Sequence, residues 1–255
     1  MASDQVLLVL LLGVPALLRH PVWRPARANQ GAGQGVLLIP GFGFGDRSLA
    51  LLSMWLRARG YRPTGARIGL NVGCTSTLVT RLERRLEEHA KATGRRVILL
   101  GQSRGGWLGR LVAIRRPDLV RALVMLASPV LDPLGVNPKS IRFARLLARL
   151  SELGLPGLLD EDCFTGECYR ASSTGLAAPV PASVPVLAVY SRQDRVVPWQ
   201  LCLDRSAECV EVPSSHTGMG LDPRLYAALE PRLTAWAAAD AVPARPAHPT
   251  VRPHV

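Results

Sequence analysis

Lysine is almost absent from this chain of 255 residues, although its formal net charge at pH 7 is +12. Lys91 and Lys139 are the only lysines, so arginine supplies nearly all of the positive charge. The arginines lie singly along predicted helices with acidic residues among them, a pattern typical of solvated helix faces. Basic and aromatic residues do not alternate, and no nucleic-acid-binding module is recognised. We therefore expect no nucleic-acid partner.

Paired zinc motifs are also missing, because none of the five cysteines belongs to a double Cys-x-x-Cys arrangement. We therefore expect no metal site. An odd number of cysteines cannot all pair within one chain. The segment "CFTGEC" could close a small disulfide between Cys163 and Cys168, which would imply an oxidising compartment. Ordinary thiols in a loop or in the core are an alternative of equal weight.

The N-terminal apolar run is too short to cross a membrane. It covers residues 6–18, "VLLVLLLGVPALL", whereas a spanning helix needs about 20 apolar residues. An Ala-x-Ala sequence at 26–28 fits a signal peptide, but no basic residue precedes the run. We interpret the run as a helix packed on the domain, with a signal sequence or anchor as the alternative. The protein is thus expected to be cytoplasmic or membrane-associated, with secretion as the alternative.

Apolar residues make up 48% of the chain, which is enough for one large core. They occur in two kinds of segment that alternate along the sequence. Short apolar runs typical of buried strands alternate with segments that have helical spacing. The strands are expected in "GVLLIP", "RPTGARI", "RVILLGQS", "VRALVMLASP", "VPVLAVYS" and "AECVEVP". This alternation predicts an α/β fold, with a mostly parallel central sheet and helices on both faces.

Three segments fall outside this alternation. Residues 131–180 are interpreted as an insertion that caps one edge of the sheet, within a domain that covers 35–239. Residues 1–34 are interpreted as an N-terminal apolar helix and a connector. The tail at 240–255 is rich in proline and has no apolar period, so it is predicted to be disordered.

A lone serine stands between glycines in "GQSRGG", where a predicted strand meets a predicted helix. Gly-x-Ser-x-Gly in this context is typical of a strained turn that exposes a nucleophilic hydroxyl, here that of Ser103. Gly101 and Gly105 fit because side chains would collide across such a turn. The backbone N–H of Arg104, at the helix N-terminus, would face a developing negative charge. A merely flexible turn is the alternative.

A serine nucleophile needs a base, and the base needs a carboxylate to orient it. Elimination among the five histidines leaves His216, in a loop after a predicted strand and at the same sheet edge as Ser103. Asp194 follows another predicted strand, and Asp132 is the competing carboxylate. The chain order Ser103, Asp194, His216 favours Asp194.

The loop "PGFGFGD" follows the first predicted strand and is expected to supply a second oxyanion donor, the N–H of Phe42. Its glycines Gly41, Gly43 and Gly45 also suggest a dinucleotide fingerprint. However, Asp46 stands where Gly-x-Gly-x-x-Gly requires glycine. The loop therefore favours an oxyanion site over a dinucleotide site.

Residues 35–239 resemble the α/β-hydrolase superfamily, in particular compact bacterial lipases and esterases. The resemblance lies in "PGFGFGD", "GQSRGG", "SRQDRVVPW" and "SSHTGMG". It implies acyl-ester hydrolysis by a serine nucleophile, without a metal or an organic cofactor. The chain departs from many lipases in having Pro40-Gly41 where they have His-Gly. The insertion at 131–180 matches no known cap, so substrate choice does not transfer.

We therefore expect a serine hydrolase of carboxylic esters, a lipase or an esterase. Its substrate would be a small-molecule or lipid ester, reached with transient membrane or lipid-surface contact. The apolar helix in "FARLLARLSELGLPGLL" favours a lid, and a helix packed on the sheet is the alternative. Leu108, Phe42, Phe44, Trp199 and the leucines of the insertion are candidates for the acyl pocket, although a place in the core is the favoured alternative for each. Thioester hydrolysis and acyl transfer need the same triad. A non-catalytic binding protein would normally lack one of its members.

Overall fold

The sheet is entirely parallel. The computed structural model describes residues 13–25 and 29–239, and its six strands run in the order β2-β1-β3-β4-β5-β6. The strands are β1 (Gly35–Ile39), β2 (Arg62–Gly65), β3 (Val97–Gln102), β4 (Val120–Leu126), β5 (Val186–Tyr190) and β6 (Glu208–Glu211). Each neighbouring pair is parallel, and the four central strands β1, β3, β4 and β5 are buried along nearly their whole length, as is usual in parallel sheets. The predicted α/β architecture is confirmed.

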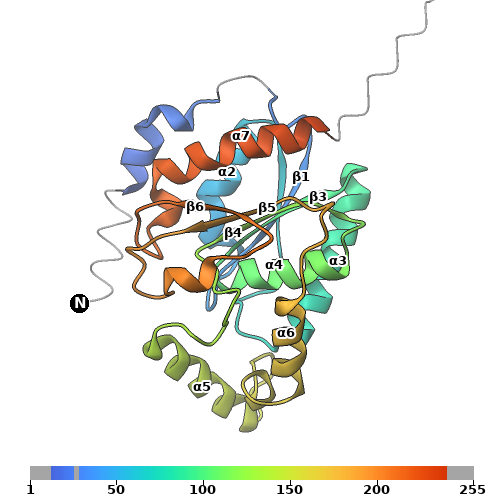
Figure 1. The fold of residues 1–255 in the computed structure, drawn as a ribbon, viewed down its shortest axis with the longest axis vertical. Helices are drawn as coiled ribbons and strands as arrows, with labels where there is room; N and C mark the ends of the chain where they lie inside the picture. Colours follow the sequence, from blue (N-terminus) through green and yellow to red (C-terminus); the bar gives the residue numbers. More distant parts are fainter. Residues whose placement is uncertain (1–12, 26–28, 240–255) are drawn as a thin grey trace, which may run out of the picture.

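Helices cover both faces of the sheet (Figure 1). The α-helices are α2 (Ala50–Ala58), α3 (Thr75–Thr93), α4 (Arg104–Arg115), α5 (Pro138–Glu152), α6 (Glu167–Ala177) and α7 (Pro223–Ala239), and residues 13–19 are also helical. Successive strand residues point to opposite faces, so Leu37 and Ile39 pack with α3 and α4. Val36 and Leu38 pack with α2 and α7 instead. The sheet is thus buried on both sides.

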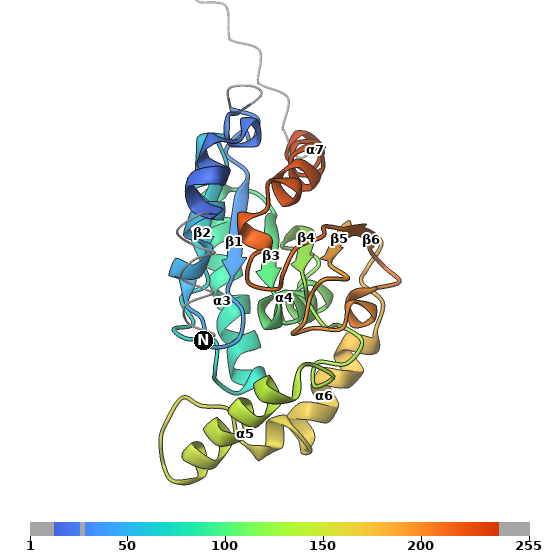
Figure 2. The same ribbon diagram turned by 90° about the vertical axis from the view of Figure 1, so that its left-hand side faces the viewer.

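The elements of the predicted insertion lie beyond the carboxyl ends of the strands, where the arrows of Figure 2 point. They are α5, the 3-10 helix η3 (Glu161–Cys163) and α6. Helix α5 begins after Asn137, whose side chain accepts a hydrogen bond from the Lys139 N–H, with Pro138 at the first position. Helix α6 packs against α3 and α4. The domain limits themselves stay a prediction.

Part of the N-terminal apolar run packs on the domain, as Leu17 is buried in the same core as α2 and α7. Residues 6–12 of the run, the Ala-x-Ala sequence at 26–28 and the tail at 240–255 lie outside the described residues. Predictions about signal processing, tail disorder and cellular location therefore stay predictions. Among the residues that the structure describes, no helix combines the length and the apolar character needed to cross a membrane.

Candidate active site

The sheet order brings two loops together at the carboxyl edge. From β1 the chain moves outward to β2, and it then returns to place β3 on the other side of β1. The chain segments that follow β1 and β3 then run in opposite directions along the sheet, and a crevice opens where they separate. Phe42 follows β1, and Ser103 follows β3. A Cβ atom on Gly41 would lie 3.4 Å from the Ser103 Cβ, so the two loops are in close proximity.

Ser103 sits on a strained turn between β3 and α4. Its backbone has φ 52° and ψ −122°, a region that a residue with a side chain rarely adopts. The Ser103 N–H donates to the Leu126 carbonyl at 2.7 Å, which ties the turn to β4. A Cβ on Gly101 would lie 2.3 Å from the Gly105 carbonyl oxygen. The geometry is that expected of a nucleophile-bearing turn.

Gly105 packs against the end of β1 so closely that a side chain cannot fit. A Cβ at this position would lie 2.3 Å from the Ile39 carbonyl oxygen and 2.5 Å from that of Pro40. We expect Gly105→Ala to lower the free energy of unfolding by about 3 kcal/mol, measured by urea unfolding. Gly220→Ala is the matched control, because its Cβ would meet nothing within 4 Å. Equal stability of the two variants would contradict the close approach.

His216 is held by Asp194. Its Nδ1 lies 2.6 Å from Asp194 Oδ2, and the side chains are 12% and 2% exposed respectively. The other oxygen of Asp194 accepts hydrogen bonds from the N–H groups of Val196 at 2.8 Å and Val197 at 2.9 Å. A carboxylate can only accept, so the proton shared with His216 sits on Nδ1 and Nε2 is left free to accept one.

Two further residues hold the His216 loop, and the sequence patterns did not single them out. The Ser191 hydroxyl donates to the Ser214 carbonyl at 2.6 Å and accepts from the Ser214 N–H at 3.0 Å. The Gln102 side chain donates to the His216 carbonyl at 3.2 Å. The one signal for Gln102 is its place next to Ser103. Ser191 carries no signal, because a serine after a strand is common.

The competing candidates lie elsewhere. Asp132 is exposed, and its Oδ1 accepts a hydrogen bond from the Leu134 N–H at 3.0 Å. His89 is buried beside the Arg62 carbonyl, with its Nε2 at 2.8 Å from that oxygen, and burial lowers the pKa of this imidazole. His89 is therefore a neutral packing residue. The structure brings Asp194, and not Asp132, to His216.

A cavity of about 860 Å³ opens at this edge and is lined by both Ser103 and His216. Its walls are largely apolar and include Phe42, Phe44 and Leu159. Such a volume suits a drug-sized or lipid-sized ligand. Among the described residues the Ser103 hydroxyl has no hydrogen-bond partner, as is common before a substrate binds.

Two of the expected pocket residues lie outside the cavity wall. Leu108 is fully buried in the core between the sheet and α3, because the inner face of α4 carries it away from the cavity. Trp199 stacks on Tyr190 with ring centroids 5.7 Å apart. Leu108 therefore follows the alternative of core packing and Trp199 is absent from the cavity wall, whereas Phe42 and Phe44 do line the cavity.

Arg104 holds the loops beside the cavity through its side chain. The guanidinium donates to the carbonyls of Asn71 at 3.2 Å and Gly73 at 2.8 Å, and to the Thr75 hydroxyl at 3.1 Å. Burial lowers the pKa of Arg104 to about 10. The Asn71 side chain in turn donates to the Pro40 carbonyl at 2.7 Å, so the β1 loop is fixed from both sides. Arg104 is also the first residue of α4, so its backbone N–H lies at the N-terminus of the helix.

Known structures share the fold of this chain. The mature lipase BlEst2 of Bacillus licheniformis superposes with a TM-score of 0.60 at 15% identity, over 84% of this chain and 96% of that chain. The chain has the α/β-hydrolase fold. The mouse α/β-hydrolase domain-containing protein 10 shares the fold with a TM-score of 0.52 at 18% identity, over 80% of this chain and 90% of that chain. The predicted resemblance is thus confirmed at the level of fold.

Sequence similarity supports the α/β-hydrolase assignment over a shorter stretch. A segment of 113 residues is 30% identical to the mitochondrial palmitoyl-protein thioesterase ABHD10 of Rattus norvegicus. The segment covers 42% of this chain and 38% of that protein, so the match spans less than half of the relative. No family model matches the chain.

Proposed function

We propose that the protein is a serine hydrolase that cleaves carboxylic acyl esters, with Ser103 as nucleophile, His216 as general base and Asp194 as its orienting carboxylate. One observation carries the proposal. A serine on a strained strand-to-helix turn opens into the same cavity as a histidine whose Nδ1 is hydrogen-bonded to a buried carboxylate. This arrangement supplies a nucleophile, a base and an orienting group.

In the proposed reaction, Ser103 Oγ forms a bond to the carbonyl carbon of the ester while its proton passes to His216 Nε2. The carbonyl oxygen becomes an oxyanion held by the backbone N–H groups of Phe42 and Arg104. His216 then gives the proton to the leaving alkoxide as the carbon–oxygen bond breaks. Water repeats the sequence to release the carboxylic acid and restore Ser103. Asp194 stabilises the imidazolium in both halves.

The proposed substrate has a substantial apolar acyl chain. Support comes from the volume of the cavity and from its apolar walls. Helix α5 lines the cavity through Ile141 and Ala144, and it also exposes Phe143 and Leu146, which are followed by exposed Leu153 and Leu155. Exposed apolar side chains on a segment that lines the cavity suit transient contact with a lipid surface. A small-molecule or lipid ester is therefore the proposed partner.

Acyl thioesters are the second candidate class. A curated relative that matches part of the chain is named a palmitoyl-protein thioesterase, and this name suggests a thioester-bound acyl group. The proposed triad would attack either carbonyl by the same steps, because the leaving atom changes from oxygen to sulfur without a new catalytic group. Acyl esters and acyl thioesters are therefore distinguished by comparing the initial rates of their hydrolysis.

Labelling with a fluorophosphonate probe tests the proposed nucleophile, and initial rates on three substrates test the substrate class. We expect folded protein to be labelled at Ser103 and to turn over long-chain nitrophenyl esters faster than short-chain ones. Faster turnover of long-chain acyl thioesters would favour the second class. A folded protein that neither labels nor turns over any of the three would contradict the enzyme proposal and favour a binding role.

A further inference from the structure

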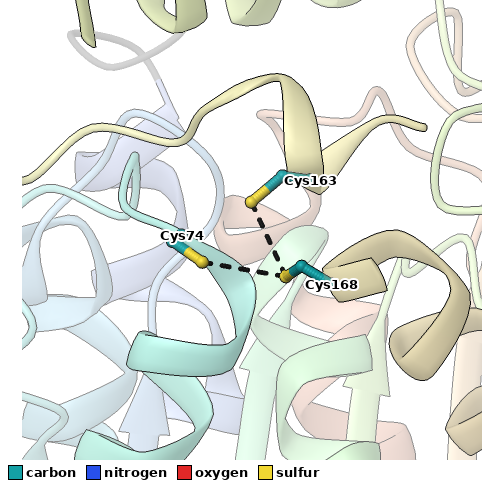
Figure 3. Close-up of side chains that lie close together, drawn as sticks. All are labelled: Cys74, Cys163 and Cys168. Atoms are coloured by element: carbon teal, nitrogen blue, oxygen red, sulfur yellow. Dashed lines mark hydrogen bonds between the residues drawn. The ribbon is translucent and has the colours of Figure 1, made fainter. Parts of the chain in front are cut away.

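Three cysteine side chains from two distant segments of the chain lie close together (Figure 3). Cys74 precedes the first turn of α3, Cys163 ends η3, and Cys168 lies in the first turn of α6. The Cys168 sulfur lies 3.7 Å from that of Cys74 and 3.7 Å from that of Cys163. All three sulfurs lie within 4.8 Å of one another. The cluster joins the insertion to α3.

Two of the three sulfur separations, at 3.7 Å each, fit a shared metal ion better than a disulfide. A Zn²⁺ ion with Zn–S bonds of about 2.3 Å in tetrahedral geometry places its sulfurs about 3.8 Å apart. A disulfide would bring two sulfurs to about 2.05 Å and would leave the third unused. Cys163 and Cys168 are free thiols in the structure, as is Cys74.

Backbone N–H groups at the start of α3 face the cluster. Cys74 immediately precedes this 19-residue helix, whose first N–H groups carry partial positive charge. The Ser76 N–H donates toward the Cys168 sulfur. The Thr75 N–H likewise interacts with the Cys163 sulfur. A metal ion binds cysteine as thiolate, so this environment prepares the ligands.

Arg104 supplies the matching charge. Among the described residues no carboxylate forms an ion pair with its buried guanidinium, which donates instead to two carbonyls and a hydroxyl. The guanidinium interacts electrostatically with all three cysteines. Three thiolates and one divalent ion carry a net charge of −1, and Arg104 brings the group to neutrality. A neutral assembly removes the cost of burying an uncompensated charge.

We propose that Cys74, Cys163 and Cys168 bind a single thiophilic metal ion, of which Zn²⁺ is the best fit, that clamps the insertion onto α3. Each thiol gives up its proton to solvent as its sulfur binds the ion, and solvent takes the fourth position. The role is structural. Because Cys163 also lines the cavity, the clamp fixes one wall of the proposed acyl site.

Zn²⁺ binding to the full-length chain, fully reduced and freed of metal, tests the proposal. Titration against a chromogenic chelator should give one Zn²⁺ per chain. Co²⁺ should give the thiolate-to-metal charge-transfer absorption in the near ultraviolet. Cys168→Ser should weaken Zn²⁺ binding by about 100-fold or more, and Cys74→Ser should do the same if the first variant fails to fold. Cys209→Ser is the matched control, because Cys209 is an exposed cysteine outside the cluster.

A stability measurement gives a second readout. Zn²⁺ at a free concentration about 100 times its Kd should raise the Tm of the wild-type chain and of Cys209→Ser by about 5 °C, but not that of Cys168→Ser. No uptake of Zn²⁺ by the reduced wild-type chain would overturn the proposal, as would equal affinity in Cys168→Ser. Ser103 takes no part in these readouts, so their failure would leave the proposed hydrolase activity standing.

Discussion

Replacing Ser103 with alanine is expected to lower kcat on an acyl ester by about 10⁶-fold while the fold persists. The substitution removes the only group that can form the acyl-enzyme bond in the proposed reaction. What remains is the binding of substrate and the oxyanion donors of Phe42 and Arg104, which retain a small acceleration over water. The measurement is the steady-state rate on a nitrophenyl ester, with circular dichroism to follow folding and Tm.

His216→Ala should cause a loss of similar size, and the double variant should lose little more, because the two side chains act as one unit. Ser140→Ala is the matched control. Ser140 is a second serine that lines the cavity, but it has no role in the proposed reaction. Its variant should therefore keep both turnover and fluorophosphonate labelling. A Ser103→Ala protein that retained wild-type turnover would show that another group is the nucleophile. Labelling lost in Ser140→Ala, but kept in Ser103→Ala, would point to Ser140.

The parts of the site that follow from the sequence are those fixed by strand ends. In a parallel sheet all carboxyl ends meet at one edge, so residues just after predicted strands come together whatever the lengths of the connecting helices. Ser103 follows β3, Asp194 follows β5 and His216 follows β6. The turn that carries Ser103 is predictable as well, since Gly101 contacts the backbone of Gly105 within the same turn. The contact of Gly105 with the end of β1 depends on the sheet order.

The cavity wall could not be predicted in the same way. Whether Leu108 faces the cavity or the core depends on the rotation of α4 on the sheet, and α4 is buried on nearly all sides, so the sequence shows no exposed polar face to indicate it. Trp199 depends on a stacking partner, Tyr190, that belongs to another segment. These outcomes are decided by tertiary packing rather than by spacing.

The cluster of Cys74, Cys163 and Cys168 could not be predicted from the sequence either. A search for Cys-x-x-Cys pairs predicts no zinc site, because it assumes that ligands are close in sequence. Cys74 lies 94 residues before Cys168, and the insertion has to fold back on α3 before the sulfurs meet. The positive charge of Arg104 carries no signal either, since the motif around Ser103 uses only its backbone N–H. The proposed metal clamp therefore departs from the expectation of no metal.

Replacing Asp194 with asparagine is expected to lower kcat by about 10⁴-fold with little change in Tm. The side-chain oxygen of asparagine can keep the hydrogen bonds from the N–H groups of Val196 and Val197. Its NH₂ group then faces His216 Nδ1, which must accept rather than donate. The imidazole proton moves to Nε2, where it blocks transfer of the Ser103 proton.

Asp132→Asn separates this effect from a general loss of negative charge. Asp132 is exposed, and its side chain accepts a hydrogen bond from the Leu134 N–H in its own turn, so this variant should keep the wild-type rate. A fall in rate for Asp132→Asn with none for Asp194→Asn would reverse the carboxylate assignment. A fall for Asp194→Asn that came with a large loss of Tm would assign Asp194 to holding the loop. If the Tm is unchanged, the loop is intact, and the Asp132→Asn control excludes a general effect of negative charge. The loss of rate then comes from the altered tautomer of His216.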